Sequence, residues 1–245
     1  MMNLPICFCL LVLLTGLNKA LATTSELRNE HLSICGDSID WPPYTYLDGE
    51  DVKGFDLDVL NHVLLPQSIT FNFTMTSWSR CLKGAKSGEF QIAVSASHSE
   101  ERAKHYLYTD WYYNITPYYL YKKSRFPKGL SIDDVAELDQ YKVCGIHGYN
   151  YGDFQLKEVE QYTHSMHELI TELKQQRCDV ILSWNEILDG IQSVWGINYV
   201  SEDIESKPIP NMAKHKFHML VSKQYEYALS LKNLLDKGLK KFQTN

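Results

Sequence analysis

The sequence lacks the short motifs that mark the common classes of enzyme. It contains no G-x-S-x-G, no H-E-x-x-H, no G-x-G-x-x-G and no phosphate-binding loop. It therefore gives no support to a serine hydrolase, a zinc protease, a dinucleotide-binding domain or a nucleoside triphosphatase. The chain also has no C-x-x-C pair, so a zinc site lacks its usual ligand spacing.

Two histidine pairs are the nearest approach to a metal-binding pattern. His164 and His167 surround an expected helix start, and His215 and His218 lie in an expected strand. Residues i and i+3 of a strand point to opposite faces, so the second pair is poorly placed to share one ion. We expect neither a metal nor a cofactor.

An excess of basic side chains is also absent. The 245 residues carry 24 Lys and Arg against 30 Asp and Glu, a net charge of −6. This balance argues against nucleic acid or an anionic membrane surface as a partner. The length suits one large domain or two small ones, and no low-complexity stretch interrupts it.

The N-terminus has the pattern of an export signal. Residues 4–17 are almost wholly apolar, too short a run to span a bilayer comfortably, and they lead to Ala20-Leu21-Ala22. We expect a signal peptide over residues 1–22, a mature chain that begins at Thr23 and a periplasmic location. No Lys or Arg precedes the apolar run, which leaves an uncleaved anchor as the alternative. Cleavage would remove Lys19 and leave a net charge of −7.

Four cysteines follow the expected signal peptide. They are Cys35, Cys81, Cys144 and Cys178, and four cysteines allow three pairings. An oxidising compartment favours disulfides. The pairs Cys35 with Cys81 and Cys144 with Cys178 would each stay within one half of the chain, and each would stabilise by about 4 kcal/mol in the chain-entropy account. Reduced thiols in a packed core are the alternative.

The first half alternates between strand-like and helix-like spacing. Strands are expected at 32–36, 69–75 and 90–96, and helices at 55–65 and 78–86. The order strand, helix, strand, helix, strand favours a parallel or mixed sheet that is covered on both faces.

The second half repeats this plan. Ser131 is expected to cap a short helix, strands are expected at 142–146 and 180–183, and Ser165 with Glu168 predicts a capping box for a helix that ends at Gln175. Two similar α/β lobes explain the repetition better than one sheet. The expected fold class is therefore α/β, with two Rossmann-like lobes and mixed sheets.

Two extended segments are expected to cross between the lobes, at 114–123 and 215–223, before a last helix at 225–242. They divide the chain into lobe 1, residues 23–118 with 219–245, and lobe 2, residues 119–218. Two crossing strands form a hinge, and a hinge between two lobes forms a cleft. Small ligands prefer such clefts.

The segment Ser95 to Tyr113, SASHSEERAKHYLYTDWYY, has the features of an anion site. A loop with three hydroxyls follows an expected strand, and Arg102 begins a helical turn. Free backbone amides, hydroxyls and an Arg suit a carboxylate, which an Arg binds in a bidentate pair. Alternatively, Arg102 is a surface residue that pairs with Glu100 or Glu101.

Four motifs in series resemble one known family. WPPYTYLDGEDVKGFDLDVL, SWSRCLKGAKSGEF, SEERAKHYLYTDWYY and LKQQRCDVIL resemble, in order and spacing, bacterial extracellular solute-binding proteins of family 3. The resemblance implies the type II periplasmic binding fold, a small-molecule solute as ligand, a monomer, and an ABC importer as the membrane partner, with no nucleic acid involved.

The resemblance also implies site residues. Tyr44 would form an aromatic wall, and Arg102 would bind the α-carboxylate of the ligand. Trp78 would be a core or rim packing residue. The remaining ligand-binding residues would be Ser95 and Ser97 in lobe 1, and Gly148, Tyr149, Asn150, Trp184 and Asn185 in lobe 2.

One departure from the family pattern concerns the ligand. The carboxylate that usually follows the lobe 2 strand and binds an ammonium group is replaced by Trp184, with Asn185 or Glu186 as substitutes. The expected function is that of a non-enzymatic protein that closes on a polar, carboxylate-bearing solute, an amino acid or a relative, and delivers it to an ABC permease. The alternatives are an exported dehydratase, with Glu186, His147 or His98 as general acid or base, and a sensory ligand-binding module.

Overall fold

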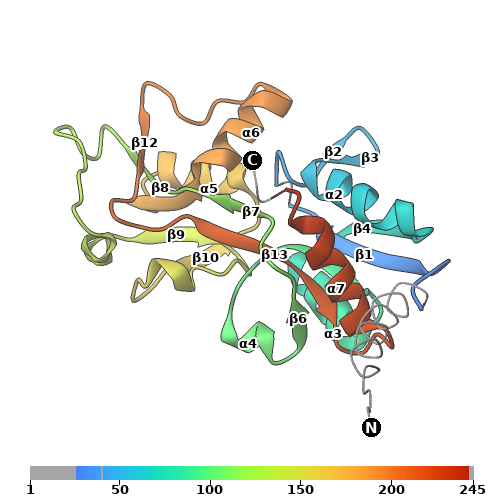
Figure 1. Cartoon of the computed structure of the whole chain (residues 1–245). Coiled ribbons are helices and arrows are strands. Elements are labelled where there is room, and N and C mark those ends of the chain that lie inside the picture. Colours follow the sequence, from blue (N-terminus) through green and yellow to red (C-terminus); the bar gives the residue numbers. More distant parts are fainter. Residues whose placement is uncertain (1–25, 40, 243–245) are drawn as a thin grey trace, which may run out of the picture.

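Each half of the chain builds its own β-sheet, and the two sheets form two lobes (Figure 1). The computed structural model describes residues 26–39 and 41–242. The expected signal peptide and its cleavage site lie outside these residues. Within them, no helix combines the length and apolar character that a membrane crossing requires.

The sheet of lobe 1 is mixed. β1 (His31–Asp37) lies between β4 (Thr70–Thr76) and β5 (Ile92–Ser97) and is parallel to both. β13 (His215–Ser222) pairs antiparallel with β5, β6 (Tyr106–Tyr108) and β7 (Tyr113–Ile115). A small hairpin of β2 (Tyr46–Asp48) and β3 (Asp51–Lys53) follows β1.

Helices cover both faces of this sheet. α2 (Phe55–Leu64) and α7 (Ala228–Leu239) pack together, and their buried leucines belong to one apolar cluster. α3 (Trp78–Ser87) packs through Trp78, Cys81 and Ala85 into a second cluster. Short helices η1 (Leu65–Gln67) and α4 (Glu100–Ala103) complete the lobe.

Lobe 2 has a second mixed sheet. Its order is β10 (Glu160–Thr163), β9 (Val143–Ile146), β11 (Val180–Trp184), β8 (Pro117–Lys122) and β12 (Ile204–Pro208). The first three strands are parallel, whereas β8 is antiparallel to its neighbours. α5 (Met166–Lys174), α6 (Asn185–Trp195), η2 (Val135–Gln140) and η3 (Gly152–Phe154) accompany it.

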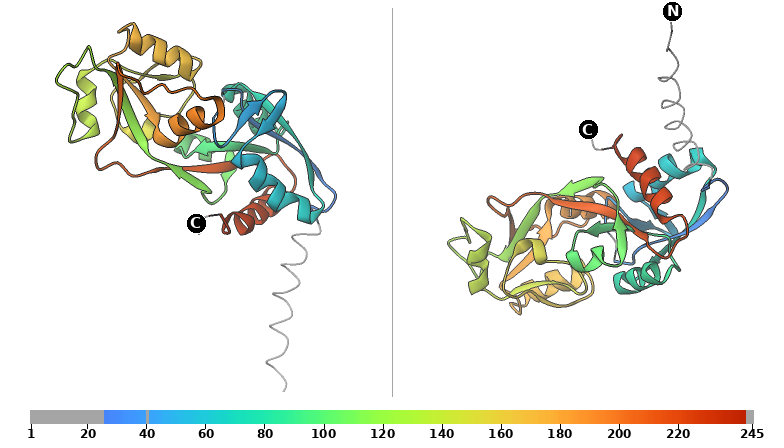
Figure 2. Two further views of the ribbon diagram at one scale, coloured as in Figure 1. Left: turned by 90° about the horizontal axis from the view of Figure 1, so that it is seen from above. Right: turned by 60° about the horizontal axis from the view of Figure 1, so that its bottom comes forward.

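The chain crosses between the sheets twice. β7 belongs to the first sheet and β8 to the second, so the first crossing falls at Thr116. The second falls between β12 and β13, which begins at His215. Figure 2 shows both crossings between the lobes. The two-lobe α/β fold expected from the sequence is confirmed. From the sheets we propose lobe boundaries at residues 116 and 213, so that all of β13 belongs to lobe 1.

Most expected elements are found, and one expected cap is wrong. Asp134, not Ser131, caps the short helix η2, because the Asp134 carboxylate accepts from the backbone N–H of Ala136. Glu137 completes the capping box. In α5, Ser165 accepts from the N–H of Glu168 as expected, but the Glu168 carboxylate binds the N–H of His164.

Both preferred cysteine pairings are confirmed. Cys35 on β1 is bonded to Cys81 on α3, and Cys144 on β9 is bonded to Cys178 before β11. Each disulfide joins the sheet of one lobe to a segment that packs on it. The alternative of reduced thiols is thereby set aside.

Candidate functional site

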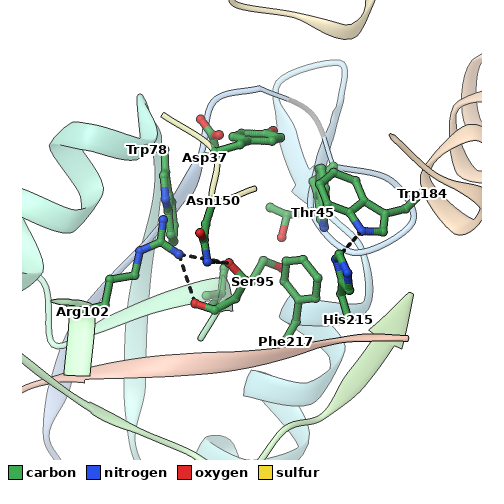
Figure 3. Close-up of a pocket in the computed structure, with 13 residues that line it drawn as sticks. Asp37, Thr45, Trp78, Ser95, Arg102, Asn150, Trp184, His215 and Phe217 are labelled. Carbon is green, nitrogen blue, oxygen red and sulfur yellow. Dashed lines mark hydrogen bonds between the residues drawn. The ribbon is translucent and has the colours of Figure 1, made fainter. Parts of the chain in front are cut away.

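A small cavity of about 50 Å³ lies between the lobes, where strands of both sheets end (Figure 3). That volume holds only a few water molecules. Most of its lining comes from lobe 1: Asp37, Trp41, Thr45, Trp78, Val94, Ser95, Ser97, Arg102, His215 and Phe217. Lobe 2 contributes Tyr149, Asn150 and Trp184.

Arg102 is the positively charged group of this cavity. Ser99 caps α4 and accepts from the Arg102 N–H, which fixes the start of the turn. The Arg102 guanidinium lies 5.4 Å from the ring centroid of Trp78 and donates to the carbonyl and hydroxyl oxygens of Ser97. Burial lowers the pKa of Arg102, so its charge is only partly solvated.

No acid among the described residues neutralises Arg102. Across residues 26–39 and 41–242, none of the ion pairs includes its guanidinium, and the carboxylate of Glu101 pairs with Lys104 instead. The alternative of a surface ion pair with Glu100 or Glu101 is therefore not what the structure shows. An Arg that is partly buried and without an acid suits an anionic ligand.

A buried network holds Ser95 in place behind the cavity. Its hydroxyl donates to the carboxylate of Asp56 at 2.6 Å and accepts from Tyr113 at 2.8 Å. Its backbone N–H donates to the Tyr112 hydroxyl at 3.0 Å, and its φ of 57° lies in the left-handed region. Both donors of Ser95 are therefore committed to the protein. Burial raises the pKa of Asp56 to about 6.

Trp41 joins this hydrogen-bond network to the wall of the cavity. Its indole N–H donates to the Tyr113 hydroxyl at 3.1 Å. Its ring meets the rings of Tyr149 and Trp184 in lobe 2 edge-on, with centroids 5.4 and 5.2 Å away. The aromatic surface of lobe 1 thus closes directly on that of lobe 2.

Asn150 makes one of the polar contacts between the lobes. Its side-chain amide donates to the Ser97 hydroxyl at 3.3 Å and to the His98 carbonyl at 2.9 Å. Ser97 therefore receives hydrogen bonds from lobe 2 as well as from Arg102. Closure of the lobes and the position of Arg102 depend on the same hydroxyl.

Trp184 and His215 form the far wall of the cavity. The Trp184 indole N–H donates to Nδ1 of His215 at 3.0 Å, and both side chains are buried. This bond joins the end of β11 to the start of β13, and so joins the two lobes beside the second crossing. Burial lowers the pKa of His215.

Asp37 is the carboxylate of the cavity. It ends β1, and burial raises its pKa to about 6 despite hydrogen bonds that include one from the Ile39 N–H at 3.2 Å. None of the ion pairs within the described ranges includes Asp37. The charged groups of the cavity, Arg102 and Asp37, therefore both come from lobe 1.

Glu186 lies at the hinge and not in the cavity. Its carboxylate accepts from the Thr116 N–H at 2.7 Å and from the Thr116 hydroxyl at 2.9 Å, and it lies 3.7 Å from the Lys214 ammonium. His147 and His98 do not line the cavity either. The three residues considered as a general acid or base are thus outside it.

Six of the nine residues expected to bind ligand line the cavity: Ser95, Ser97, Arg102, Tyr149, Asn150 and Trp184. Three do not. Tyr44 is 8% exposed and stacks on Tyr113 with ring centroids 3.7 Å apart, Gly148 forms a turn at φ 80°, and Asn185 donates to Asp189. Trp41, rather than Tyr44, is the aromatic residue of this stretch that lines the cavity.

Sequence reasoning took Trp78 for a packing residue only, and it missed six other residues of the lining: Asp37, Trp41, Thr45, Val94, His215 and Phe217. One signal was available for Asp37 and Trp41. Asp37 ends β1 and Trp41 follows it, and ligands in open α/β sheets bind beyond the carboxyl ends of the strands. His215 and Phe217 lie on a crossing strand and offered no such signal.

Comparison with known proteins supports this description. The family described as bacterial extracellular solute-binding proteins, family 3, matches residues 34–131. No curated protein sequence matches the chain. The crystal structure of the arginine-, lysine-, histidine-binding protein ArtJ from Geobacillus stearothermophilus has a TM-score of 0.69 at 17% identity, with 86% of this chain and 89% of that one covered.

Two other solved structures represent different kinds of protein. The ancestral amino acid-binding protein AncCDT-1, a precursor of cyclohexadienyl dehydratase, has a TM-score of 0.68 at 18% identity, with 91% and 94% covered. A histidine kinase sensor domain with similarity to periplasmic binding proteins has a TM-score of 0.70 at 16% identity, with 89% and 92% covered.

At these identities the solved structures establish the fold. The family match covers the N-terminal part of lobe 1, the first crossing and the beginning of lobe 2. The resemblance to bacterial extracellular solute-binding proteins of family 3 is therefore confirmed, and the chain has the two-lobe fold of the type II periplasmic binding proteins.

Proposed function

We propose that this protein binds a small carboxylate-bearing solute, an amino acid or a close relative, between its two lobes outside the cytoplasm and delivers it to an ABC permease. The observation that carries the proposal is Arg102, which lines the interlobe cavity and has no acidic partner in the described part of the chain. A bidentate Arg to carboxylate pair would satisfy that charge.

The mechanism would be a shift from open to closed lobes. The cavity of about 50 Å³ is too small to hold an amino acid, so the lobes would have to separate for one to bind. The crossings at Thr116 and before His215 are the places where the chain can bend. Contacts made only when both lobes touch the solute would favour the closed form.

Binding is favoured over catalysis by the placement of the titratable groups. Glu186, His147 and His98 do not line the cavity, and Glu186 holds the hinge. The titratable groups there are Arg102, Asp37, His215 and Tyr149, of which Arg102 suits a carboxylate directly. The matching family is one of solute-binding proteins.

A thermal-shift panel of the amino acids and of hydroxy and keto acids tests the proposal, since a ligand of the folded state raises the melting temperature. Arg102→Ala should weaken binding by roughly 10- to 150-fold, because hydrogen bonds to a charged group contribute about 1.5–3 kcal/mol. The matched control is Arg80→Ala, an exposed Arg on α3. Equal loss in both variants, or no stabilising acid at all, would contradict the proposal.

A further inference from the structure

His215 is a buried polar side chain at the cavity for which the fold itself gives no evident need. It begins β13, is 6% exposed, and lines the cavity beside Trp184 and Phe217. The ring of Phe154 meets its ring edge-on at 4.8 Å. An apolar side chain would suit these surroundings better unless the imidazole has a partner.

One nitrogen of the ring has its partner within the protein. The indole N–H of Trp184 can only donate, so Nδ1 of His215 must accept, over 3.0 Å. A protonated imidazole has no acceptor and would lose this bond. Burial lowers the pKa of His215, which also keeps the ring neutral near pH 7. The hydrogen of the neutral ring is therefore on Nε2.

The other nitrogen has no such partner in the described part of the chain. Nε2 of His215 is buried, and no atom of the described residues forms a hydrogen bond with it. A buried donor without an acceptor is costly, and few such groups occur in native proteins. Trp184 thus fixes an N–H donor on a ring that lines both the ligand cavity and a second pocket, which it shares with Asp153.

We propose that Nε2–H of His215 donates a hydrogen bond to the bound solute, which makes His215 a specificity-determining residue. This inference rests on the proposed solute-binding function. Figure 3 shows Arg102 and His215 on opposite sides of the cavity. A carboxylate at Arg102 would therefore place another part of the same solute at His215.

The acceptor at His215 is a neutral one. The neighbours of His215 in the chain are two lysines with other partners. The Lys214 ammonium lies 3.7 Å from the Glu186 carboxylate, and the Lys216 ammonium lies 5.4 Å from the Trp111 ring centroid. A second carboxylate beside Trp184 would lack a counter-charge. The solute class is thus an acid with a hydroxyl, carbonyl or amide oxygen distant from its carboxylate.

Matched pairs of ligands test the assignment by calorimetry. The pairs are L-glutamine with L-methionine, L-asparagine with L-leucine, and 5-hydroxypentanoate with pentanoate, in each of which the first member carries a neutral oxygen away from the carboxylate. In at least one pair, the wild type should bind the acceptor-bearing member about tenfold more tightly, the loss expected for one unpaired buried donor. His215→Asn retains an acceptor for Trp184 and removes the Nε2 donor, and should abolish this preference. His215→Gln should retain part of it.

The control is His164→Asn, an exposed histidine of lobe 2, which should leave the preference unchanged. Two outcomes would overturn the role of His215 and leave the proposed function standing. One is a preference that survives in His215→Asn, and the other is Arg102-dependent binding without any preference in the wild type. If no acid binds the wild type at all, the proposed function fails and this inference fails with it.

A spectroscopic measurement distinguishes the proposed role from a merely structural one. In protein labelled with ¹⁵N at histidine, the His215 signals, identified by their loss in His215→Asn, should report the Nε2–H tautomer. Saturation with the preferred acid should shift the Nε2 signal and leave the tautomer unchanged. An Nε2 signal that ignores the ligand and instead moves in Asp153→Asn would show that the donor faces Asp153, and would overturn the proposal.

Discussion

Gly190 on α6 of lobe 2 lies directly against the backbone of Pro42 in lobe 1. A Cβ added to Gly190 would come within 2.3 Å of the Pro42 carbonyl oxygen, and backbone cannot give way as a flexible side chain can. The closed arrangement of the lobes therefore requires glycine at position 190. An arrangement in which Pro42 and α6 are apart would not impose this requirement, because the contact is between lobes.

Gly190→Ala should hold the lobes apart. We expect a larger radius of gyration in solution scattering and at least tenfold weaker binding of whichever acid stabilises the wild type. Unfolding free energy should change by less than about 1 kcal/mol, since alanine favours the helix. Ser193→Ala, on the exposed part of α6, is the matched control. Identical scattering of Gly190→Ala and wild type would contradict the role of this contact.

Asp37 should titrate near pH 6. Its pKa in the folded protein is raised to about 6, above the usual 3.8, so the folded state favours the protonated form. The resulting stability is fully present below about pH 4 and is lost as the pH rises through 6, by at most about 3 kcal/mol. Carbon NMR of the carboxyl group should show the midpoint. Asp37→Asn should flatten this part of the stability profile; a midpoint near 4 would refute the expectation.

Glu186→Gln should loosen the hinge. The charged carboxylate accepts two hydrogen bonds from Thr116, and the neutral amide would accept them less strongly. We expect a loss of about 1–2 kcal/mol in unfolding free energy by urea titration. Asp189→Asn, at an exposed carboxylate of the same helix, should change stability less. Equal stability of both variants would show that Glu186 does not restrain the first crossing.

The two disulfides should stabilise their own lobes. Replacing Cys144 and Cys178 together by alanine, or Cys35 and Cys81 together, should cost about 2–5 kcal/mol in either case. Thermal unfolding in the presence and absence of a reductant would measure this cost. The reductant should lower the melting temperature of the wild type and should not change that of a variant in which all four cysteines are replaced. This difference would show that the loss comes from the disulfides.

The export prediction can be examined directly. Mass spectrometry of the protein from the periplasmic fraction should give a chain that begins at Thr23, because Ala20-Leu21-Ala22 suits signal peptidase. Retention of residues 1–22 in a membrane fraction would instead support the uncleaved anchor.

Local features of the chain were predictable from their own residues. Apolar spacing located the strands and helices, because the side-chain periods of 2 and 3.6 residues are set by the backbone alone. Arg102 was found because its loop, cap and helical turn lie within eight residues, Ser95 to Arg102. The cysteine pairing followed from the division into two halves, since each bond stays inside one lobe.

The tertiary structure decided which aromatic and polar groups meet in the cleft. Trp41 and Tyr44 are three residues apart in one aromatic stretch, yet the fold turns the first to the cavity and stacks the second on Tyr113. Trp184 and His215 lie 31 residues apart and belong to different sheets. Contacts of this kind depend on how the lobes close on each other, and no local spacing in the sequence encodes that geometry.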